Sequence, residues 1–231
     1  MSLGRAGGAG GVRRARRDTV WFFDLDDTLH HATPHIFPHM NRLMTAYVME
    51  HLALDEAAAS ALRESYWHRY GATLLGLMKR HGTDPRHFLA ATHQFPDLAA
   101  MVVNEKRLRQ TLRALPGVKV LFSNAPKGYV SAVLALLKID DLFVEVVTME
   151  SLKFRPKPST AAMRRVFARH PARYQIMVED NLPNLRTARR CGLGTVWMRP
   201  DKIRFRGRPC GVDLTVKSLQ QVRKSVGAGT L

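Results

Sequence analysis

The second half of the sequence alternates between short apolar runs and segments with helical periodicity, and this alternation constrains the fold more than any other feature. The apolar runs lie at residues 118–122, 143–148, 176–178 and 195–198, after an earlier run at residues 20–23. The helical segments between the later runs lie at residues 129–138, 159–169 and 183–190. Strands that alternate with helices form parallel sheets joined by right-handed crossovers. The pattern therefore predicts an α/β core in which helices flank a parallel sheet.

A helical block separates the first expected strand from the second. Apolar residues within 34–113 recur at three- and four-residue spacing, and Gly71, Gly82, Pro85 and Pro96 divide the block into several helices. We interpret this block as an inserted all-helical domain, which we call the cap. The expected division of the chain is a disordered basic arm at 1–17, a core at 18–33 and 114–215, the helical cap at 34–113 and a C-terminal tail at 216–231.

Polar groups stand where the expected strands end. In open parallel sheets, ligands bind at the carboxyl ends of the strands. The polar residues at these ends are Asp24, Asp26 and Thr28, then Ser123 and Asn124, then Lys157, and finally Glu179 and Asp180. The strand ends thus bring two carboxylate pairs, a hydroxyl and an ammonium group toward one edge of the sheet. This convergence predicts a site at that edge.

The acidic residues favour a bound divalent cation over a solvated turn. In an extended chain Asp24 and Asp26 face the same side, and two carboxylates held close together repel each other. A cation resolves this conflict, and Glu179 with Asp180 would complete a site of hard oxygen ligands. Such a site suits Mg²⁺, which binds one or two carboxylates together with the phosphate of a substrate. A lysine and a serine hydroxyl at the neighbouring strand ends are suited to hold a phosphoryl group.

As a set, these residues resemble the four motifs of the haloacid dehalogenase superfamily. The motifs are read here as Asp24-Leu25-Asp26-Asp27-Thr28, Ser123 with Asn124, Lys157 within Arg155-Pro156-Lys157-Pro158, and Glu179-Asp180. The resemblance covers about residues 19–200. It implies a Rossmann-like core, a helical cap inserted after the first motif, and phosphoryl transfer through an aspartyl-phosphate.

The resemblance also implies a role for each motif residue. Asp24 would be the nucleophile and Asp26 the general acid and base. A dehalogenase has no leaving alkoxide to protonate, so Asp26 argues against that activity. The Mg²⁺ ligands would be Asp24, Asp26 through its main-chain carbonyl, Glu179 and Asp180. The phosphate-binding residues would be Thr28, Ser123, Asn124 through its backbone, and Lys157, of which the lysine is also catalytic.

Within the superfamily, the sequence is most similar to the pyrimidine 5′-nucleotidases. The similarity lies in the cap, in residues 70–77 (YGATLLGL) and in Thr92-His93. It implies that the substrate is a small phosphate monoester, a pyrimidine nucleoside 5′-monophosphate, read by the cap residues Tyr70, Thr73 and His93. One departure is Glu179, because that family commonly has two aspartates in the fourth motif and a glutamate–aspartate pair also occurs in sugar-phosphate mutases. A sugar-phosphate phosphatase or phosphomutase is therefore the alternative enzyme.

An excess of positive charge leaves a non-enzymatic alternative open. The chain has 36 Lys and Arg residues against 19 Asp and Glu residues, a formal net charge of +17. A basic surface can bind nucleic acid, and the arm at 1–17 is a candidate for such binding. A positive exterior would equally steer a phosphorylated substrate inward. The alternative is a nucleic-acid- or partner-binding protein on a phosphatase scaffold, although a scaffold has no need of four repelling carboxylates.

Composition also sets expectations about location. No apolar run approaches the roughly 18 residues that cross a bilayer, so no membrane partner is expected. The two cysteines, Cys191 and Cys210, suggest no disulfide framework. A reducing, cytoplasmic setting is therefore expected.

Some polar residues near the first motif are expected to be structural. Asp27 faces away from Asp24, and a local hydrogen bond to the backbone is the expected role of its carboxylate. The histidines that follow are interpreted as loop and cap-interface residues, namely His30, His31, His35 and His39.

Overall fold

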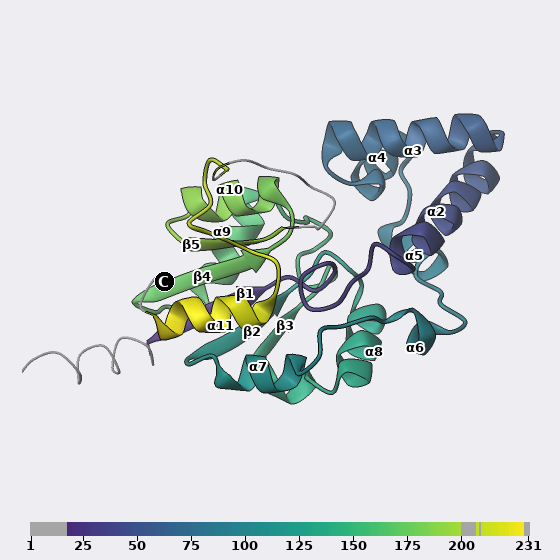
Figure 1. The fold of residues 1–231 in the computed structure, drawn as a ribbon. Coiled ribbons are helices and arrows are strands. Elements are labelled where there is room, and N and C mark those ends of the chain that lie inside the picture. The colour runs from purple at the N-terminus through teal and green to yellow at the C-terminus, as the bar shows by residue number, and fades with distance from the viewer. Residues whose placement is uncertain (1–17, 200–206, 208, 229–231) are drawn as a thin grey trace, which may run out of the picture.

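The computed structural model describes residues 18–199, 207 and 209–228, and its centre is a six-stranded sheet (Figure 1). The strands are β1 (Thr19–Phe23), β2 (Val118–Phe122), β3 (Glu145–Val147), β4 (Tyr174–Glu179), β5 (Gly194–Met198) and β6 (Leu214–Val216). Their order across the sheet is β3-β2-β1-β4-β5-β6, and every pairing is parallel. The predicted parallel α/β core is confirmed. The sequence pattern identified every strand except β6.

Helices cover both faces of the sheet, because the central strands are apolar on both sides. The helices on one face are α7 (Leu108–Ala114), α8 (Lys127–Leu137) and α11 (Leu219–Gly227), and those on the other are α9 (Thr160–Ala168) and α10 (Leu182–Arg190) (Figure 1). In β1, Trp21 and Phe23 pack toward the first face, whereas Val20 and Phe22 pack toward the second. All of β1 is buried, as expected for a strand in the middle of a covered parallel sheet.

The cap is a cluster of helices inserted between β1 and β2, set to one side of the sheet (Figure 1). Its helices are α2 (Ile36–Leu52), α3 (Glu56–Tyr70), α4 (Thr73–His81) and α5 (Pro85–Thr92). Capping residues set the ends of these helices, and α3 is an example. Asp55 caps α3 by accepting from Ala58 N at 2.8 Å, and Gly71 ends the same helix in the left-handed conformation. The apolar faces of these helices form one cluster that also takes in Met149 from the core.

The packing of some helices departs from the predicted division of the chain. Helices α6 (Leu98–Met101) and α7 fall within the range assigned to the cap, yet Leu108 and Leu112 of α7 belong to the apolar cluster on the sheet. Helix α11 falls within the predicted tail, yet its buried residue Leu219 belongs to the same cluster. Each helix has an apolar face that needs a partner, and the sheet provides one. The predicted arm at 1–17 lies outside the described residues.

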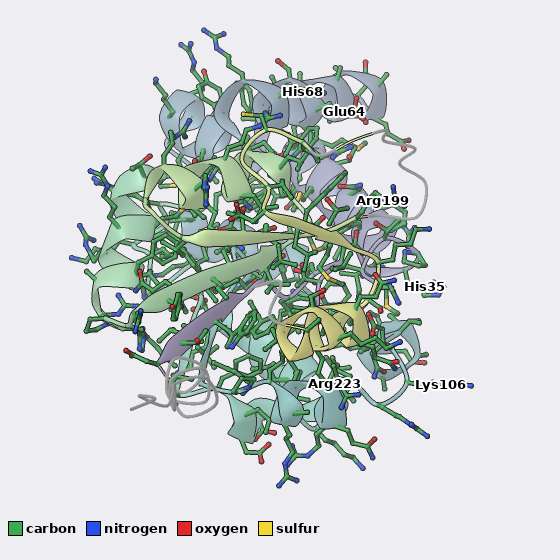
Figure 2. All side chains as sticks on the ribbon, turned by 60° about the vertical axis from the view of Figure 1, so that its left-hand side comes forward. His35, Glu64, His68, Lys106, Arg199 and Arg223 are labelled. Atoms are coloured by element: carbon green, nitrogen blue, oxygen red, sulfur yellow. The ribbon has the colours of Figure 1, made fainter. Side chains whose placement is uncertain are left out.

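Polar side chains lie at the surface of both the core and the cap. Figure 2 shows Glu64 and His68 on α3, Arg223 on α11 and Lys106 just before α7, and all four are exposed. Within the described part of the chain, no helix combines the length and the apolar character needed to cross a membrane.

We expect Gly76→Ala to destabilise the protein. Alanine usually stabilises a helix interior by roughly 0.5–1 kcal/mol relative to glycine. In α4, however, a Cβ on Gly76 would lie 2.3 Å from Cγ of Tyr66 in α3. The free energy of unfolding, measured by chemical denaturation, should therefore fall by roughly 1–3 kcal/mol. The control is Gly128→Ala in α8, where no atom lies within 4 Å of the added Cβ. Equal effects of the two changes would contradict a requirement for glycine between α3 and α4.

Candidate active site

Lys157 lies between two acidic residues at the carboxyl edge of the sheet. Asp24 directly follows β1 and Glu179 ends the neighbouring β4, so the pairing of these strands sets the two acids side by side. Lys157 Nζ donates to Asp24 Oδ1 and to Glu179 Oε2, both at 2.7 Å. The lysine side chain is 1% exposed. Burial alone would lower the pKa of this ammonium, but the charges of Asp24 and Glu179 outweigh burial and raise it. The lysine therefore stays protonated.

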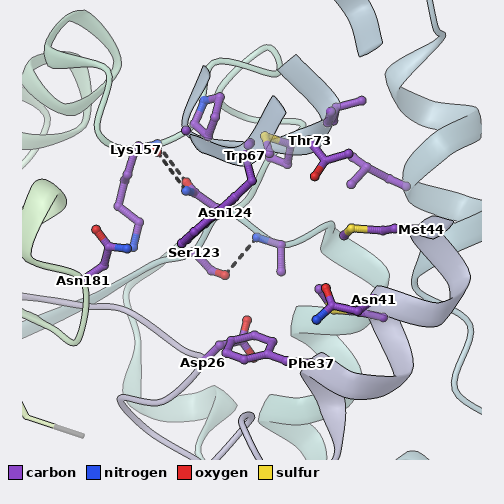
Figure 3. A pocket seen from close by; sticks show the side chains of 18 of the residues that line it. Asp26, Phe37, Asn41, Met44, Trp67, Thr73, Ser123, Asn124, Lys157 and Asn181 are labelled. Atoms are coloured by element: carbon purple, nitrogen blue, oxygen red, sulfur yellow. Dashed lines mark hydrogen bonds between the residues drawn. The ribbon is translucent and has the colours of Figure 1, made fainter. Parts of the chain in front are cut away.

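The side chain of Asn124 fixes the loop that carries Lys157. Its Oδ1 accepts from Lys157 N at 2.8 Å and its Nδ2 donates to Lys157 O at 3.0 Å (Figure 3). These bonds tie the end of β2 to the loop before α9. The neighbouring Ser123 is buried, and its Oγ accepts from Ala125 N at 3.0 Å. The sequence predicted Asn124 as a phosphate ligand through its backbone and did not indicate that its side chain positions the lysine.

Asp180 adds a third carboxylate to the pair that Lys157 joins. One carboxylate oxygen from each of Asp24, Glu179 and Asp180 lies within 4.8 Å of the others. Burial raises the pKa of Asp24 to about 8, and the charge of Glu179 adds to this effect. Burial and Glu179 also raise the pKa of Asp180. Three carboxylates thus stand beside one lysine, and a cation that prefers oxygen ligands, such as Mg²⁺, fits both the donor set and the excess negative charge.

Two side chains that the sequence did not predict for the site hold Asp26. The hydroxyl of Tyr129 donates to Asp26 Oδ1 at 2.6 Å, and His30 Nε2 lies 2.9 Å from the same oxygen. Both Tyr129 and His30 are buried. His30 lies in the loop between β1 and α2, as predicted, but the sequence did not indicate its contact with Asp26. Among the described residues nothing bonds the other oxygen, Oδ2. Asp26 is thus fixed through one oxygen and free at the other.

The remaining residues of the first motif lie away from the pocket. Asp27 has a φ of 54°, and its carboxylate accepts from Ala32 N at 2.8 Å and Thr33 N at 2.9 Å. Its predicted local role is confirmed. Thr28 is buried, and its Oγ1 has no hydrogen-bond partner within the described parts of the chain. Thr28 does not line the pocket described next, so its contact with phosphate stays a prediction.

A pocket of about 600 Å³ separates the core residues from the cap. All of the core residues predicted for the site line it except Thr28. The wall formed by the cap is largely apolar and includes Phe37, Met44 and Trp67, all three labelled in Figure 3. The volume lies in the range of roughly 300–1,000 Å³ that is common for small-molecule sites. The pocket can therefore hold a group larger than phosphate.

The structure brings two of the three predicted cap residues to this pocket. Tyr70 does not line it, and its hydroxyl accepts from Arg80 Nε at 2.9 Å. Thr73 lines the pocket, but its hydroxyl donates to the carbonyl of Arg63 at 3.0 Å. His93 also lines the pocket, and burial lowers its pKa to about 4, so this imidazole is neutral at pH 7. We did not predict Trp67 from the sequence. The one available signal for it was an aromatic side chain one helical turn before Tyr70.

Known proteins share the sequence features of this chain. Residues 20–192 match the family model of the haloacid dehalogenase-like hydrolases. Phosphate metabolism protein 8 of Saccharomyces cerevisiae is 26% identical over 198 residues, which cover 77% of this chain and 60% of that protein. The match thus spans less than two thirds of the length of this relative.

Solved structures share the fold. A HAD phosphatase from Thermococcus onnurineus superposes with a TM-score of 0.63 at 19% identity, over 90% of this chain and 98% of that one. The HAD-hydrolase YfnB of Bacillus subtilis, solved bound to magnesium, superposes with a TM-score of 0.58 at 16% identity, over 91% of this chain and 99% of that one. At these identities the likeness concerns the fold alone.

We expect Asp24→Asn to stabilise the metal-free protein, and more so at pH 8 than at pH 5. The raised pKa of Asp24 means that its negative charge is less favourable in the folded state than in the unfolded state. This penalty is absent below the ordinary pKa of 3.8 and grows as the pH rises toward 8. Asparagine cannot ionise and avoids it.

Calorimetry in EDTA measures this effect. The Tm of the variant should exceed that of the wild type by roughly 2–4 °C for each kcal/mol gained. A Tm difference that stays constant between pH 5 and pH 8 would contradict the assigned charge repulsion.

Proposed function

The chain belongs to the haloacid dehalogenase-like hydrolases, and on this premise we propose that it is a Mg²⁺-dependent phosphomonoesterase that acts through an aspartyl-phosphate. The observation that carries the proposal is the buried Lys157, bonded to both Asp24 and Glu179 at one end of the pocket. A fixed ammonium in a site with little water stabilises the negative charge of phosphate oxygens strongly. The adjoining carboxylates supply a nucleophile and cation ligands in the same place.

Asp24 begins the proposed reaction. One of its carboxylate oxygens attacks phosphorus and forms an aspartyl-phosphate, while the ester P–O bond breaks and its electron pair goes to the leaving oxygen. Asp26 Oδ2, the oxygen that Tyr129 and His30 leave free, gives a proton to that leaving oxygen. The same Oδ2 then takes a proton from water as the water attacks phosphorus. Inorganic phosphate is released and the carboxylate of Asp24 is restored.

The acidic residues would hold a resident Mg²⁺. The residues proposed as its ligands are Asp24, Glu179, Asp180 and the main-chain carbonyl of Asp26. When bound, the ion draws negative charge from the phosphate oxygens and so favours attack on phosphorus. Support comes from the clustered carboxylates and the raised pKa of Asp24. The magnesium bound to the Bacillus subtilis hydrolase of similar fold is consistent with this role.

Pyrimidine nucleoside 5′-monophosphates are the proposed substrates. The pocket extends beyond the phosphate-binding end, and its apolar wall suits a planar base. The cap sequence at residues 70–77 resembles that of pyrimidine 5′-nucleotidases. The name of the yeast relative refers to phosphate metabolism, in agreement with a phosphate ester as substrate.

A cytoplasmic location is part of the proposal. Cys191 is partly buried and Cys210 is exposed, and neither forms a disulfide. Unpaired thiols persist in reducing compartments.

Phosphate release from a panel of monophosphates tests the function. With Mg²⁺ the protein should hydrolyse p-nitrophenyl phosphate, and UMP or CMP with higher kcat/KM, and EDTA should abolish both activities. Asp24→Asn should lower kcat by roughly 10⁴-fold or more. The control is Asp141→Asn, which neutralises an exposed acid paired with Arg109 outside the pocket. Full turnover by purified Asp24→Asn, or equal rates with Mg²⁺ and EDTA, would overturn the mechanism.

We expect Tyr129→Phe to slow the hydrolysis of esters with poor leaving groups. Without the hydroxyl, Asp26 loses its shorter hydrogen bond and is held less firmly for proton transfer. The kcat for UMP should fall by about tenfold, and the kcat for p-nitrophenyl phosphate should fall less because its leaving group needs no proton.

Tyr66→Phe is the control for this change. It removes a tyrosine hydrogen bond of similar length, to His81 at 2.7 Å, within the cap. If Tyr129→Phe lowered kcat for both esters by the same factor, the tyrosine would not act through proton transfer.

A further inference from the structure

Trp67 is an aromatic side chain that the core reaction does not use. It is 53% exposed, whereas Trp21 and Trp197 are each 1% exposed in the core. Trp67 lies on α3 and lines, from the cap side, the same pocket that Lys157 lines from the core. Leaving a large aromatic ring half in water forgoes its burial on folding. An exposed indole on the wall of a pocket is instead suited to stack against a planar ligand.

A polar group of fixed orientation stands on the same wall. Asn41 of α2 lines the pocket, and its Oδ1 accepts from Arg63 Nη1 at 3.0 Å. Because the oxygen of the amide faces the guanidinium, its NH₂ group is left as the free end, with two donors. No described residue accepts from this Nδ2. Asn41 therefore has two donors to offer a ligand, whereas its oxygen already accepts from Arg63.

Arg63 is itself held in place. Its side chain is 13% exposed, and its Nη2 contacts Glu64 Oε1 at 3.3 Å. The hydroxyl of Thr73 donates to its main-chain carbonyl, which ties the start of α4 to α3. Thr73, expected from the sequence to contact the substrate, thus supports the residue that orients Asn41. Its contribution to selection is indirect.

We propose that Trp67 and Asn41 form a base-binding subsite for the leaving group of the substrate, with Arg63 as a positioning residue. The inference rests on the proposed phosphomonoesterase function. The base stacks on the indole, and a ring carbonyl oxygen accepts from Asn41 Nδ2. Uracil and cytosine both carry such an oxygen at position 2, so the subsite takes pyrimidine nucleotides as a class. Tyr70, which sequence similarity suggested as the stacking residue, is bonded to Arg80 outside the pocket.

Tryptophan fluorescence tests the subsite without turnover. The experiment uses the full-length Asp24→Asn protein titrated with UMP, and with ribose 5-phosphate as the ligand that lacks only the base. Stacking should quench the emission of the exposed Trp67 saturably with UMP and not with ribose 5-phosphate, while the buried Trp21 and Trp197 stay unchanged. Absence of a saturable change with UMP, or the same change after Trp67→Phe is added, would overturn the proposal.

Steady-state kinetics with the same two ligands test whether the subsite favours a substrate that carries a base. The measured quantity is kcat/KM for UMP divided by kcat/KM for ribose 5-phosphate. Trp67→Ala should lower this ratio by roughly 5- to 150-fold, the range expected for loss of one base stack, and Trp67→Phe should retain most of it. Asn41→Asp, which replaces donors with acceptors, should lower the ratio for UMP and CMP alike. Tyr70→Ala, on the same helix but outside the pocket, is the matched control and should leave the ratio unchanged.

The results of these experiments distinguish a failure of the proposed subsite from a failure of the proposed function. If Trp67→Ala and Tyr70→Ala change the ratio equally, the subsite is wrong although phosphatase activity stands. If the wild type hydrolyses neither ligand, the proposed function fails, and the fluorescence titration still decides whether a base stacks on Trp67. Because Trp67 is half exposed, its truncation opens no cavity in the core, and an unchanged Tm confirms that the variant is folded.

Discussion

The burial of Lys157 between Asp24 and Glu179 is the interaction on which the rest of the structure depends. A charged group is costly to bury unless an opposite charge accompanies it, so the buried ammonium of Lys157 needs a carboxylate beside it and the two carboxylates need the ammonium. The two acids end neighbouring strands, whereas the lysine comes from the loop before α9. The ion pair therefore needs the sheet and that loop together, and the bonds from Asn124 to the lysine backbone keep the loop in register.

The two walls of the pocket divide the chemistry between them. The core wall carries the charges that we propose act on phosphate, and the cap wall carries apolar side chains and the Asn41–Arg63 pair that we propose contact the group attached to it. Met149, from the segment after β3, packs into the apolar cluster of the cap. This contact links the cap to the edge of the sheet that bears the charges. The two walls thus lie in different parts of the molecule, and the packing of Met149 connects them.

The sequence predicted the core of the fold and most of the core residues that line the pocket, because both follow from rules that act along the chain. Apolar runs mark buried strands, and the residue after each run lies at the carboxyl edge. The bond between Tyr129 and Asp26 joins residues on different elements, so no local pattern indicated it. Whether Trp67 or Tyr70 lines the pocket depends on how α3 is rotated about its axis against α4. Side-chain packing between the two helices determines that rotation. Helix α11 was assigned to a tail because its short amphipathic run has no partner nearby in sequence.

The parallel pairing of β1 also determines the order in which the molecule can be assembled. Val20 pairs with Val118 on one side and with Gln175 on the other, so β1 is synthesised long before either neighbour. The cap helices α2 to α5 follow one another directly along the chain, and contacts between nearby segments form faster than contacts between distant ones. The cap can therefore take shape while β1 is still unpaired. Asp24 meets Glu179 only when β4 docks, so in a nascent chain the cap wall, which we propose selects the substrate, can form before the charged wall of the core.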